Sequence, residues 1–323
     1  MKISFILPTY NNEQTVEDLL KSIFMQDFPR EEFEVLFLDG GSIDRTLEIA
    51  KKYPVKIINN PKKVEENAYI MGIEMAKGDI LAFTDADNVL IGKDWIKKML
   101  EPFEDKEIVF ADQMYYSYRP NDKMSVKYQG LIGGDDPFAT YLGLYSRWCY
   151  FTNNWTSYPY EKEKKKNYWK CKLKDGEKIP SFSTNGLLIR KNVLNKMKLR
   201  PFTEIDIFYR LINSGHNCFA KVDAGLVHNQ VSFFGKKMRR VSRRHKKEIE
   251  TEYHYGITKM KTIIAALWVI TVIPVFVDMM IGFIRKPTLA WLFHPIACFG
   301  EFGIYFFYSF LYKHILLGEE KGF

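Results

Sequence analysis

The chain of 323 residues is long enough for one catalytic-sized domain with an additional segment, and its 46% apolar and 27% charged residues exclude a disordered or fibrous protein. The net charge of +8 is concentrated in residues 235–247, which hold eight Lys and Arg and no acid. The rest of the chain is neutral on balance, so no nucleic acid partner is expected. The four cysteines form no CxxC pair, which argues against a zinc site and favours a reduced, cytoplasmic catalytic domain.

The first 110 residues alternate between strand and helix patterns. Because strands that alternate with helices form right-handed βαβ units, a parallel sheet is expected. Ligands bind such sheets at the carboxyl ends of the strands. Apolar runs predict strands at 3–7, 35–38, 55–58 and 80–83, helical stripes predict helices at 13–26, 46–52 and 64–76, and the chemistry is expected at 8–11, 39–44 and 84–88.

Residues 111–182 are less regular. Within them, residues 150–180 mix aromatic residues with eight lysines, which fits either a solvated insertion or an acceptor loop whose aromatic rings pack on a ligand. The regular pattern then resumes with a strand at 186–189, a helix at 204–213 and strands near 218–222 and 226–228.

The last 60 residues are strongly apolar. Residues 262–284 and 289–311 are two runs of 23 residues with one formal charge each, Asp278 and Glu301, and both are long enough to cross a bilayer. With the basic segment before them, they predict a transmembrane hairpin in a multi-pass protein of the cell membrane. The Arg285–Lys286 turn would then face outward against the positive-inside rule, which a shallow re-entrant hairpin avoids. A buried hairpin in a soluble core is the alternative.

These patterns together predict the domain organisation. A catalytic domain at 1–230 would consist of a nucleotide-binding half at 1–110 and an acceptor half at 111–230, followed by a basic juxtamembrane segment at 231–260 and two transmembrane helices at 261–317. Removal of everything after about residue 255 is then expected to leave a soluble domain that binds the donor. The arginines of the basic segment would anchor it on anionic lipid or clamp a donor diphosphate.

Acidic residues follow two of the predicted strands. Asp85 and Asp87 come after the strand at 80–83, where two carboxylates can converge on one hard cation that bridges the phosphates of a nucleotide and stabilises a departing diphosphate. A solvated turn is the alternative. Asp39 ends another strand before two glycines and can accept a hydrogen bond from a base or ribose, whereas Ser42 or Asp44 can cap the next helix. Because no GxGxxG follows the first strand, a dinucleotide-binding Rossmann site is not expected.

Several short motifs occur in a fixed order over about 110 residues: Ile6–Asn11 (ILPTYN), Phe37–Ser42 (FLDGGS) with Asp44 and Thr46, Glu66-Asn67, Gly72, Ala76–Asp79 (AKGD) and Asp85-Ala86-Asp87. Their order and spacing resemble the family 2 glycosyltransferases with an α/β GT-A fold. The resemblance implies a UDP- or GDP-linked sugar donor, Mg²⁺ or Mn²⁺, and inversion at the anomeric carbon. It implies that Pro8, Tyr10 and Glu13 surround the nucleobase, that Asp39 holds uracil or guanine, that Asn67 and Asp85 belong to the donor site, and that Asp87 with Asp85 binds the metal.

The second half resembles the family more loosely, at residues 184–186 and 203–211. The sequence TEIDIFYRL resembles the family's Glu-Asp-x-Asp-Leu-x-x-Arg helix start, with Thr-Glu in place of Glu-Asp. The resemblance implies Glu204 as the catalytic base, with Asp206 as the alternative, although Thr203 and Asp206 also fit an N-cap with a capping-box partner. His228 would complete the metal or diphosphate site, and a structural role is the alternative for a lone histidine.

The expected function is the transfer of a sugar from a nucleotide donor to a hydroxyl of a membrane- or lipid-linked glycan acceptor. A polyprenyl-phosphate sugar synthase is the first alternative. Its acceptor phosphate is already a nucleophile and needs no strong base, so the acidic start of the helix at 204 favours a hydroxyl acceptor. The second alternative is a non-catalytic membrane scaffold that binds sugar nucleotides, which the presence of both Asp85 and Asp87 disfavours.

Overall fold

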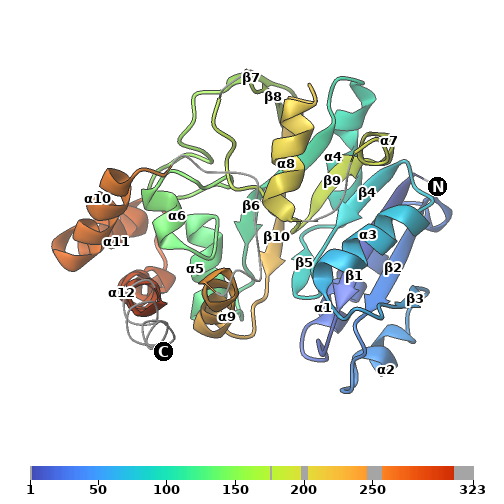
Figure 1. The fold of residues 1–323 in the computed structure, drawn as a ribbon, viewed down its shortest axis with the longest axis horizontal. Coiled ribbons are helices and arrows are strands. Elements are labelled where there is room, and N and C mark those ends of the chain that lie inside the picture. Colours follow the sequence, from blue (N-terminus) through green and yellow to red (C-terminus); the bar gives the residue numbers. More distant parts are fainter. Residues whose placement is uncertain (1, 175–176, 198–202, 246–256, 309–323) are drawn as a thin grey trace, which may run out of the picture. The chain divides into compact units, whose positions relative to one another are not determined.

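A computed structural model describes residues 2–174, 177–197, 203–245 and 257–308 (Figure 1). The chain divides into two compact units. The first unit consists of Met1–Pro120 and Tyr158–Val231, and the second consists of Asn121–Ser157 and Ser232–Phe323. The sequence pattern places residues 121–157 inside a continuous catalytic domain at 1–230, whereas the structure groups this segment with the C-terminal helices.

One mixed sheet forms the first unit. Its strands follow the order β3-β2-β1-β4-β9-β6-β10-β8-β7, and β5 pairs with β10. The strands β3, β2, β1 and β4 are mutually parallel, as their alternation with helices predicts. The bounds are β1 Ile3–Thr9, β2 Phe33–Asp39, β3 Lys56–Asn59, β4 Ile80–Phe83, β5 Asn88–Leu90, β6 Phe110–Ser117, β7 Glu161–Lys164, β8 Tyr168–Lys172, β9 Leu187–Arg190 and β10 Cys218–His228.

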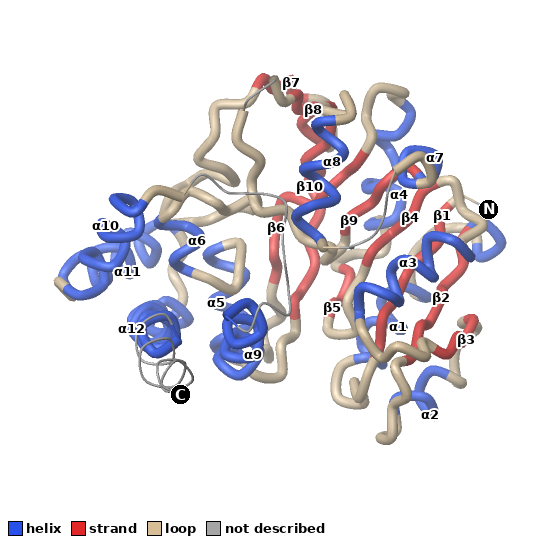
Figure 2. Tube along the Cα trace, viewed as in Figure 1, coloured by secondary structure: helices blue, strands red, loops and turns tan. Residues whose placement is uncertain are grey.

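Helices cover both faces of this sheet. Alternate residues of β1 point to opposite faces, so Phe5 packs in a core with α1, α2 and α4, while Ile6 packs against α3 on the other side. A Cβ at Gly72 of α3 would lie 2.4 Å from the Ile6 side chain, which explains the glycine there. Figure 2 shows α3 lying over β1 and β2. The bounds are α1 Val16–Phe24, α2 Thr46–Ala50, α3 Glu65–Met75, α4 Trp95–Leu100, α7 Lys191–Leu194 and α8 Glu204–Asn213, with 3-10 turns at Arg30–Glu32 and Glu101–Glu104.

The sheet continues beyond the parallel half in a way that the sequence pattern does not predict. The strand β9 runs antiparallel to β4 and β6, and β10 is one strand with a bulge between Val222 and Gly225 instead of two short strands. Within it, Lys221 Nζ lies 2.7 Å from Asp112 Oδ2 of β6, and both side chains are fully buried. Residues 150–180, expected as an irregular insertion, contain the antiparallel hairpin β7–β8.

The second unit is helical in its described part. Two helices at 124–141 were not expected, since that region shows no regular apolar pattern. A network of buried polar groups joins them to the C-terminal helices: Tyr128 and Tyr141 bond the two ring nitrogens of His294, at 2.7 and 3.1 Å. The bounds are α5 Met124–Ile132, α6 Pro137–Tyr141, α9 Phe233–His245, α10 Lys259–Ile270, α11 Ile273–Arg285, a 3-10 turn at Leu289–Leu292, and α12 Phe293–Phe306.

The expected pair of straight spanning helices requires correction. The first apolar run is broken at Val272, whose φ is +66°, and the axes of α10 and α11 are bent by 82°. Among the described residues, only Leu289–Phe306 is one helix long and apolar enough to cross a membrane, with the bent pair as a broken or re-entrant second candidate. The multi-pass expectation is therefore not supported, and the part of the expected second helix after residue 308 lies outside the described residues.

The structure also changes the expected result of truncation after residue 255. Such a chain lacks α12, so Tyr128 and Tyr141 lose His294, and Asp136 loses the hydroxyl of Tyr305 at 2.5 Å. Because buried polar groups without partners are costly, we expect this fragment to aggregate in detergent-free buffer, whereas a chain ending at residue 308 keeps these contacts. Gel filtration and circular dichroism of fragment 1–255 in detergent-free buffer, with the chain ending at residue 308 in detergent as the reference, provide the measurement. A monodisperse, folded fragment 1–255 would contradict it.

Candidate functional site

Two loops at the carboxyl ends of β1 and β2 are joined by hydrogen bonds. The backbone N–H of Asn11 donates to Ser42 Oγ at 2.9 Å, and Asn11 Oδ1 accepts from the N–H of Ile43 at 2.9 Å. The N–H of Glu13 donates to Asp44 Oδ2 at 3.1 Å, and Glu13 Oε2 accepts from the N–H of Arg45 at 3.2 Å. The paired loops therefore form a wall that is held together by the protein's own hydrogen bonds.

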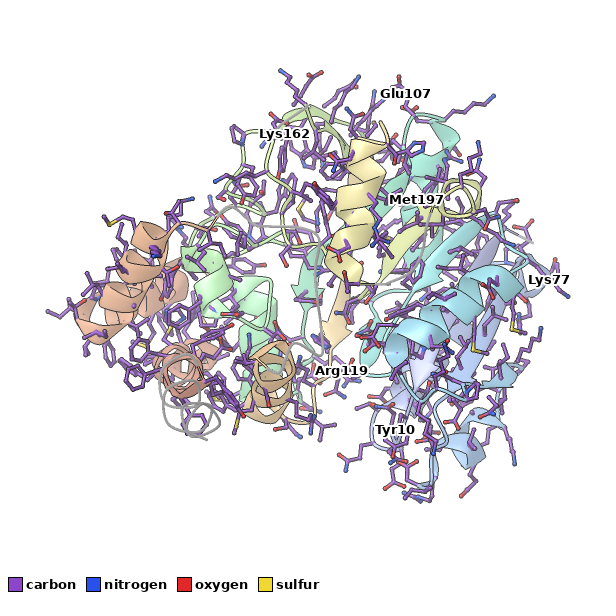
Figure 3. All side chains as sticks on the ribbon, viewed as in Figure 1. Tyr10, Lys77, Glu107, Arg119, Lys162 and Met197 are labelled. Carbon is purple, nitrogen blue, oxygen red and sulfur yellow. The ribbon has the colours of Figure 1, made fainter. Side chains whose placement is uncertain are left out.

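Tyr10 and Pro8 lie on this wall. Tyr10, labelled in Figure 3, projects from the end of β1 and its side chain is 55% exposed, while Pro8 is half-buried. A Cβ at Gly40 would lie 3.5 Å from the Tyr10 ring, an ordinary contact distance, so the end of β2 lies directly beside this ring. An exposed aromatic ring beside a prebuilt loop is suited to stacking on a planar base.

Asp39 and Asp44 both act within the second loop. Asp39 is 5% exposed, and its carboxylate accepts hydrogen bonds from the N–H groups of Gly41 and Ser42 and from Ser42 Oγ, at 2.6–3.3 Å. Burial alone would raise the pKa of Asp44, but hydrogen bonds from Thr46 and from the backbone of Glu13 outweigh it and lower that pKa. The N-cap position of α2 is Arg45, not Ser42 or Asp44, but Asp44 Oδ1 accepts from the N–H of Thr46, the first residue of this helix, at 3.0 Å. The contact of Asp39 with a base stays a prediction.

Asn67 lies on α3 and is 8% exposed. Its amide nitrogen donates to Asn60 Oδ1 at 2.8 Å, and Asn60 in turn donates to the carbonyl of Val64 at 2.8 Å. These bonds hold the turn between β3 and α3. The hydrogen bonds of Asn67 thus shape this turn, and its predicted role in donor binding stays a prediction.

Asp85, Asp87 and His228 converge at the carboxyl end of β4. One possible ligand atom from each side chain lies within 4.8 Å of the other two, and His228 Nε2 is 3.4 Å from Asp87 Oδ1. The β5–β10 pairing causes this approach, because it places His228 opposite Asn88, directly after Asp87. Residues separated by about 140 positions thus meet as the resemblance implies, although their role as metal ligands stays a prediction.

Buried amide groups hold the acidic loop in place. Asn88 Oδ1 accepts from the N–H of Asp85 at 3.0 Å, and Asn88 Nδ2 donates to Asn185 Oδ1 at 2.7 Å and to Asp87 Oδ1 at 3.3 Å. Asn185 belongs to the 184–186 turn, where Gly186 adopts a φ of +73° and a Cβ would lie 2.5 Å from Gln113 Oε1. The turn therefore requires glycine at 186 and supports the acidic loop from behind.

The predicted base positions lie at the start of α8. Thr203 is the N-cap of this helix, and its Oγ1 accepts from the N–H of Asp206 at 3.3 Å, as the capping pattern predicts. Asp206 is fully buried. Glu204 is the first residue of α8, but its side chain lies outside the described part of the structure. The geometry therefore leaves the choice between the two acids to experiment.

Sequence reasoning did not identify Tyr69 or Gln230 as parts of this site, and it included Asn88 only as the end of the expected stretch 84–88. The Tyr69 hydroxyl is 2.8 Å from Asp85 Oδ1, and Gln230 Nε2 is 3.4 Å from His228 Nε2. Gln230 follows His228 by two residues at a strand end, which is a usable signal. Tyr69 lies in the middle of α3 and has no such signal, because only the packing of α3 on the sheet brings its ring against Phe83 and its hydroxyl to Asp85.

The carboxyl edge of this α/β sheet carries an acidic pair, a histidine and two hydrogen-bonded loops. This combination is typical of one class of protein, the transferases that act on nucleotide-linked sugars. The family model described as "Glycosyl transferase family 2" matches residues 4–197. The chain therefore belongs to glycosyl transferase family 2, and its sheet is that of the GT-A fold.

Two curated relatives match parts of the chain. The poly(ribitol-phosphate) beta-N-acetylglucosaminyltransferase TarS of Staphylococcus aureus is 34% identical over 143 residues, which cover 42% of this chain and 22% of TarS. The dolichol-phosphate mannosyltransferase of Pyrococcus furiosus is 38% identical over 94 residues, which cover 27% of this chain and 26% of that protein. The matches thus span about a quarter of the length of these relatives.

A solved structure shares the fold. The mannosyltransferase PcManGT of Pyrobaculum calidifontis, in complex with GDP-Man and Mn²⁺, superposes with a TM-score of 0.53 at 15% sequence identity, covering 96% of this chain and 87% of that one. At this identity the likeness shows the fold alone.

Proposed function

We propose that the chain transfers a sugar, with inversion, from a UDP- or GDP-linked donor to a hydroxyl of a membrane- or lipid-linked glycan acceptor. The observation that carries this proposal is the convergence of Asp85, Asp87 and His228 at the end of β4, beside the loop wall at 9–13 and 40–46. Family membership and the GT-A fold support it. TarS is named for transfer to a poly(ribitol-phosphate), which is a hydroxyl-bearing polymer.

The acidic cluster fits a divalent cation. Two atoms bound to one Mg²⁺ at about 2.1 Å lie at most about 4.2 Å apart, so ligand atoms already within 4.8 Å need only small movements. Carboxylate oxygens suit Mg²⁺ and Mn²⁺. Asp87 and Asp85, with His228, would hold the ion, which supplies positive charge against the leaving diphosphate. PcManGT is described with Mn²⁺, which supports the same choice here.

The other residues bind and orient the reactants. Tyr10 and Pro8 offer an aromatic and an apolar surface to the nucleobase, and the turn held by Asp39 presents polar groups to its edge. Glu13 fixes the wall through Arg45. At the acceptor side, Glu204 or Asp206 would accept the hydroxyl proton as the new glycosidic bond forms and the bond to the diphosphate breaks.

A polyprenyl-phosphate sugar synthase is the second candidate. It is favoured by the 38% identity with the dolichol-phosphate mannosyltransferase over 94 residues. In that reaction the acceptor is a phosphate and no strong base is needed. The membrane is a proposed partner in both cases, because the described C-terminal helices expose many large apolar side chains. The proposed location is therefore the membrane surface, with the catalytic unit in the cytoplasm.

Donor binding provides the test. Full-length protein in detergent is heated with UDP- and GDP-linked sugars, each with Mg²⁺, Mn²⁺ or EDTA, and the melting temperature is recorded. We expect one nucleotide class to stabilise the protein only with a divalent cation. Transfer from the stabilising donor to a lipid extract and to soluble glycans then separates the acceptor classes. Absence of stabilisation by every donor, with metal present, would contradict the proposal. Stabilisation by a donor that is neither hydrolysed nor transferred in the presence of metal would instead support the scaffold alternative.

A further inference from the structure

The helix α12 presents its apolar side outward. His294, Cys298 and Glu301 lie on its buried side and are 0% exposed, whereas Ile296 and Phe299 on the other side are 54% and 39% exposed. A water-soluble helix has the opposite arrangement. The outward side is therefore suited to hydrocarbon. On the inward side, His294 is hydrogen-bonded to Tyr128 and Tyr141, and Glu301 is paired with Lys237 at 3.5 Å.

The helices α10 and α11 form a bent pair with apolar residues at the bend. Ile270 and Ile273, on either side of the bend, are 57% and 74% exposed. Both outer ends are basic, with Lys259 and Lys261 at one end and Arg285 and Lys286 at the other, and all four are exposed. The charges thus flank an apolar apex.

The dimensions of the bent pair fit one leaflet. Its arms of 12 and 13 residues are about 18 and 20 Å long, shorter than the ~30 Å hydrocarbon core. With the 82° bend shared equally between the arms, the apex lies about 12 Å below the basic ends, within the ~15 Å of one leaflet. Both basic ends then stay at the same surface.

The basic helix α9 lies along α12. The Phe234 ring packs so closely on Gly300 that a Cβ added to this glycine would lie 2.5 Å from the ring. The same ring stacks on Phe293 with a distance of 6.4 Å between ring centroids. Lys237 Nζ is 3.5 Å from Glu301 Oε2 and 2.8 Å from Asp136 Oδ2. These contacts follow α12 for eight residues, or about 12 Å.

This contact disfavours a spanning α12. The helix α9 carries six Lys and Arg in 13 residues, and Arg239, two residues after Lys237, is exposed. A spanning α12 would carry that arginine toward the bilayer centre, where a charged side chain is costly. Lying in the interface, α12 buries its apolar side while α9 remains at the headgroups. The cationic helix is complementary to anionic lipid.

We propose that the second unit is a one-leaflet membrane module that binds the anionic surface of a bilayer: α10, α11 and α12 enter the hydrocarbon of one leaflet, and α9 lies at the headgroups. This proposal rests on the proposed function: it identifies the membrane partner as an anionic lipid surface and states how the second unit binds it. In this arrangement the basic ends of the bent pair, Lys259 with Lys261 and Arg285 with Lys286, lie on one face of the membrane.

Cysteine labelling tests the placement of the α11 end. The native cysteines Cys149, Cys171, Cys218 and Cys298 are all buried, so background labelling is low. Lys286→Cys is compared with Lys77→Cys, since Lys77 is an exposed residue of the first unit (Figure 3). Each variant is treated with a membrane-impermeant maleimide, once in sealed right-side-out vesicles and once in sealed inside-out vesicles. We expect both cysteines to react from the same side. Labelling of Lys286→Cys only from the opposite side would establish a spanning helix and overturn the proposal.

Vesicle flotation tests the apolar apex and the lipid charge. Ile273→Glu is expected to weaken partition into phosphatidylcholine vesicles with 30% phosphatidylglycerol by at least ~10-fold, because it puts a charge into hydrocarbon. Ile43→Glu is the matched control, since Ile43 is 89% exposed on the first unit. Wild-type binding should fall on pure phosphatidylcholine and in high salt. Equal effects of the two substitutions would contradict the proposal. Neither assay needs sugar transfer, so an inactive protein that still floats would refute only the proposed function.

A second observation concerns Tyr69, which is 1% exposed. Its hydroxyl lies 2.8 Å from Asp85 Oδ1 and 3.1 Å from both Glu65 Oε1 and Thr184 Oγ1. The hydroxyl has one proton, and the shortest contact assigns it to Asp85, while Thr184 can donate to the Tyr69 oxygen. One oxygen of Asp85 is thereby held in a fixed direction, which leaves the other oxygen for a cation.

We infer that Tyr69 is a positioning residue for the proposed metal site, acting through Asp85. Tyr69→Phe keeps the ring that packs on Phe83 at 5.5 Å and removes only the hydroxyl. Loss of such a supporting partner typically weakens metal binding by ~10–100-fold. We expect this loss in Mn²⁺ titrations followed by electron paramagnetic resonance, with the KM for metal raised more than kcat is lowered.

Two controls separate positioning from a structural role. Tyr128→Phe removes a buried hydroxyl that bonds His294 at 2.7 Å in the second unit, and it should leave Mn²⁺ affinity unchanged. In a background of Asp85→Asn, Tyr69→Phe should have little further effect on affinity. Unchanged Mn²⁺ binding by Tyr69→Phe, or full additivity with Asp85→Asn, would overturn the inference. Failure of the wild-type protein to bind Mn²⁺ would instead refute the metal site of the proposed function.

Discussion

Asp87→Ala is expected to abolish sugar transfer, by at least ~10³-fold, while the protein stays folded. The reason is that Asp87 supplies a carboxylate to the cluster with Asp85 and His228, and a cation held there would stabilise the leaving diphosphate. Transfer assays with saturating Mn²⁺ measure the loss, and the melting temperature reports folding. His228→Ala should cost less, because both carboxylates remain.

Asp223→Ala is the matched control for this prediction. Asp223 is an exposed acid on β10, five residues before His228, and the same Asp-to-Ala change there should leave transfer and metal dependence unaltered. Wild-type protein should also lose activity in excess EDTA and recover it with Mg²⁺ or Mn²⁺. Full transfer by the wild-type protein in EDTA would remove the metal from the mechanism.

The N-terminal half of the fold could be predicted because its signals are local. The strands β1, β2 and β4 are short buried runs, and the site motifs follow these strands directly, so the topology of a parallel sheet places Asp39 and Asp85 at one edge. Side chains there need no long-range information to be found. His228 was identified through the family resemblance, while its approach to Asp87 depends on the β5–β10 pairing.

The second half depends on pairings between distant segments. Lys221 in β10 would be expected to break a buried strand, but Asp112 lies directly opposite it in β6 and neutralises it. A lone sequence does not reveal such a pair. In the same way, the apolar pattern of α5 and α6 is too weak to predict that these helices pack against α12, where His294 bonds Tyr128 and Tyr141.

The apolar C-terminal runs show why composition alone is insufficient. Their length fits two spanning helices, but residue order within each run decides the outcome. Val272 with its positive φ breaks the first run, and the placement of His294 and Glu301 on one side of α12 gives that helix a protein-facing side. Mean hydropathy detects neither the break at Val272 nor the polar side of α12. The helical spacing of His294 and Glu301 within the apolar run could have indicated that polar side.

Substitution of the two acids of α8 separates the proposed enzymatic reactions. A sugar hydroxyl must lose its proton as the new bond forms, and a positioned base typically contributes ~10²–10⁴-fold. If Glu204 is that base, Glu204→Gln should lower turnover by this factor and leave donor affinity nearly unchanged, since the amide keeps the shape and loses the basicity. Turnover is measured at saturating donor, and affinity by thermal shift.

Asp206→Asn gives the complementary result. Asp206 is fully buried, so in a structural role the change of its carboxylate should cost about 1–3 kcal/mol of unfolding free energy with little effect on kcat, while its backbone N–H keeps the bond to Thr203. Urea unfolding measures this cost. The reverse pattern, with a large loss of kcat for Asp206→Asn and a small one for Glu204→Gln, would move the base to Asp206. If neither change slows transfer more than a few-fold, no general base is needed, and a phosphate acceptor becomes the better explanation, as in the dolichol-phosphate mannosyltransferase that this chain partly resembles.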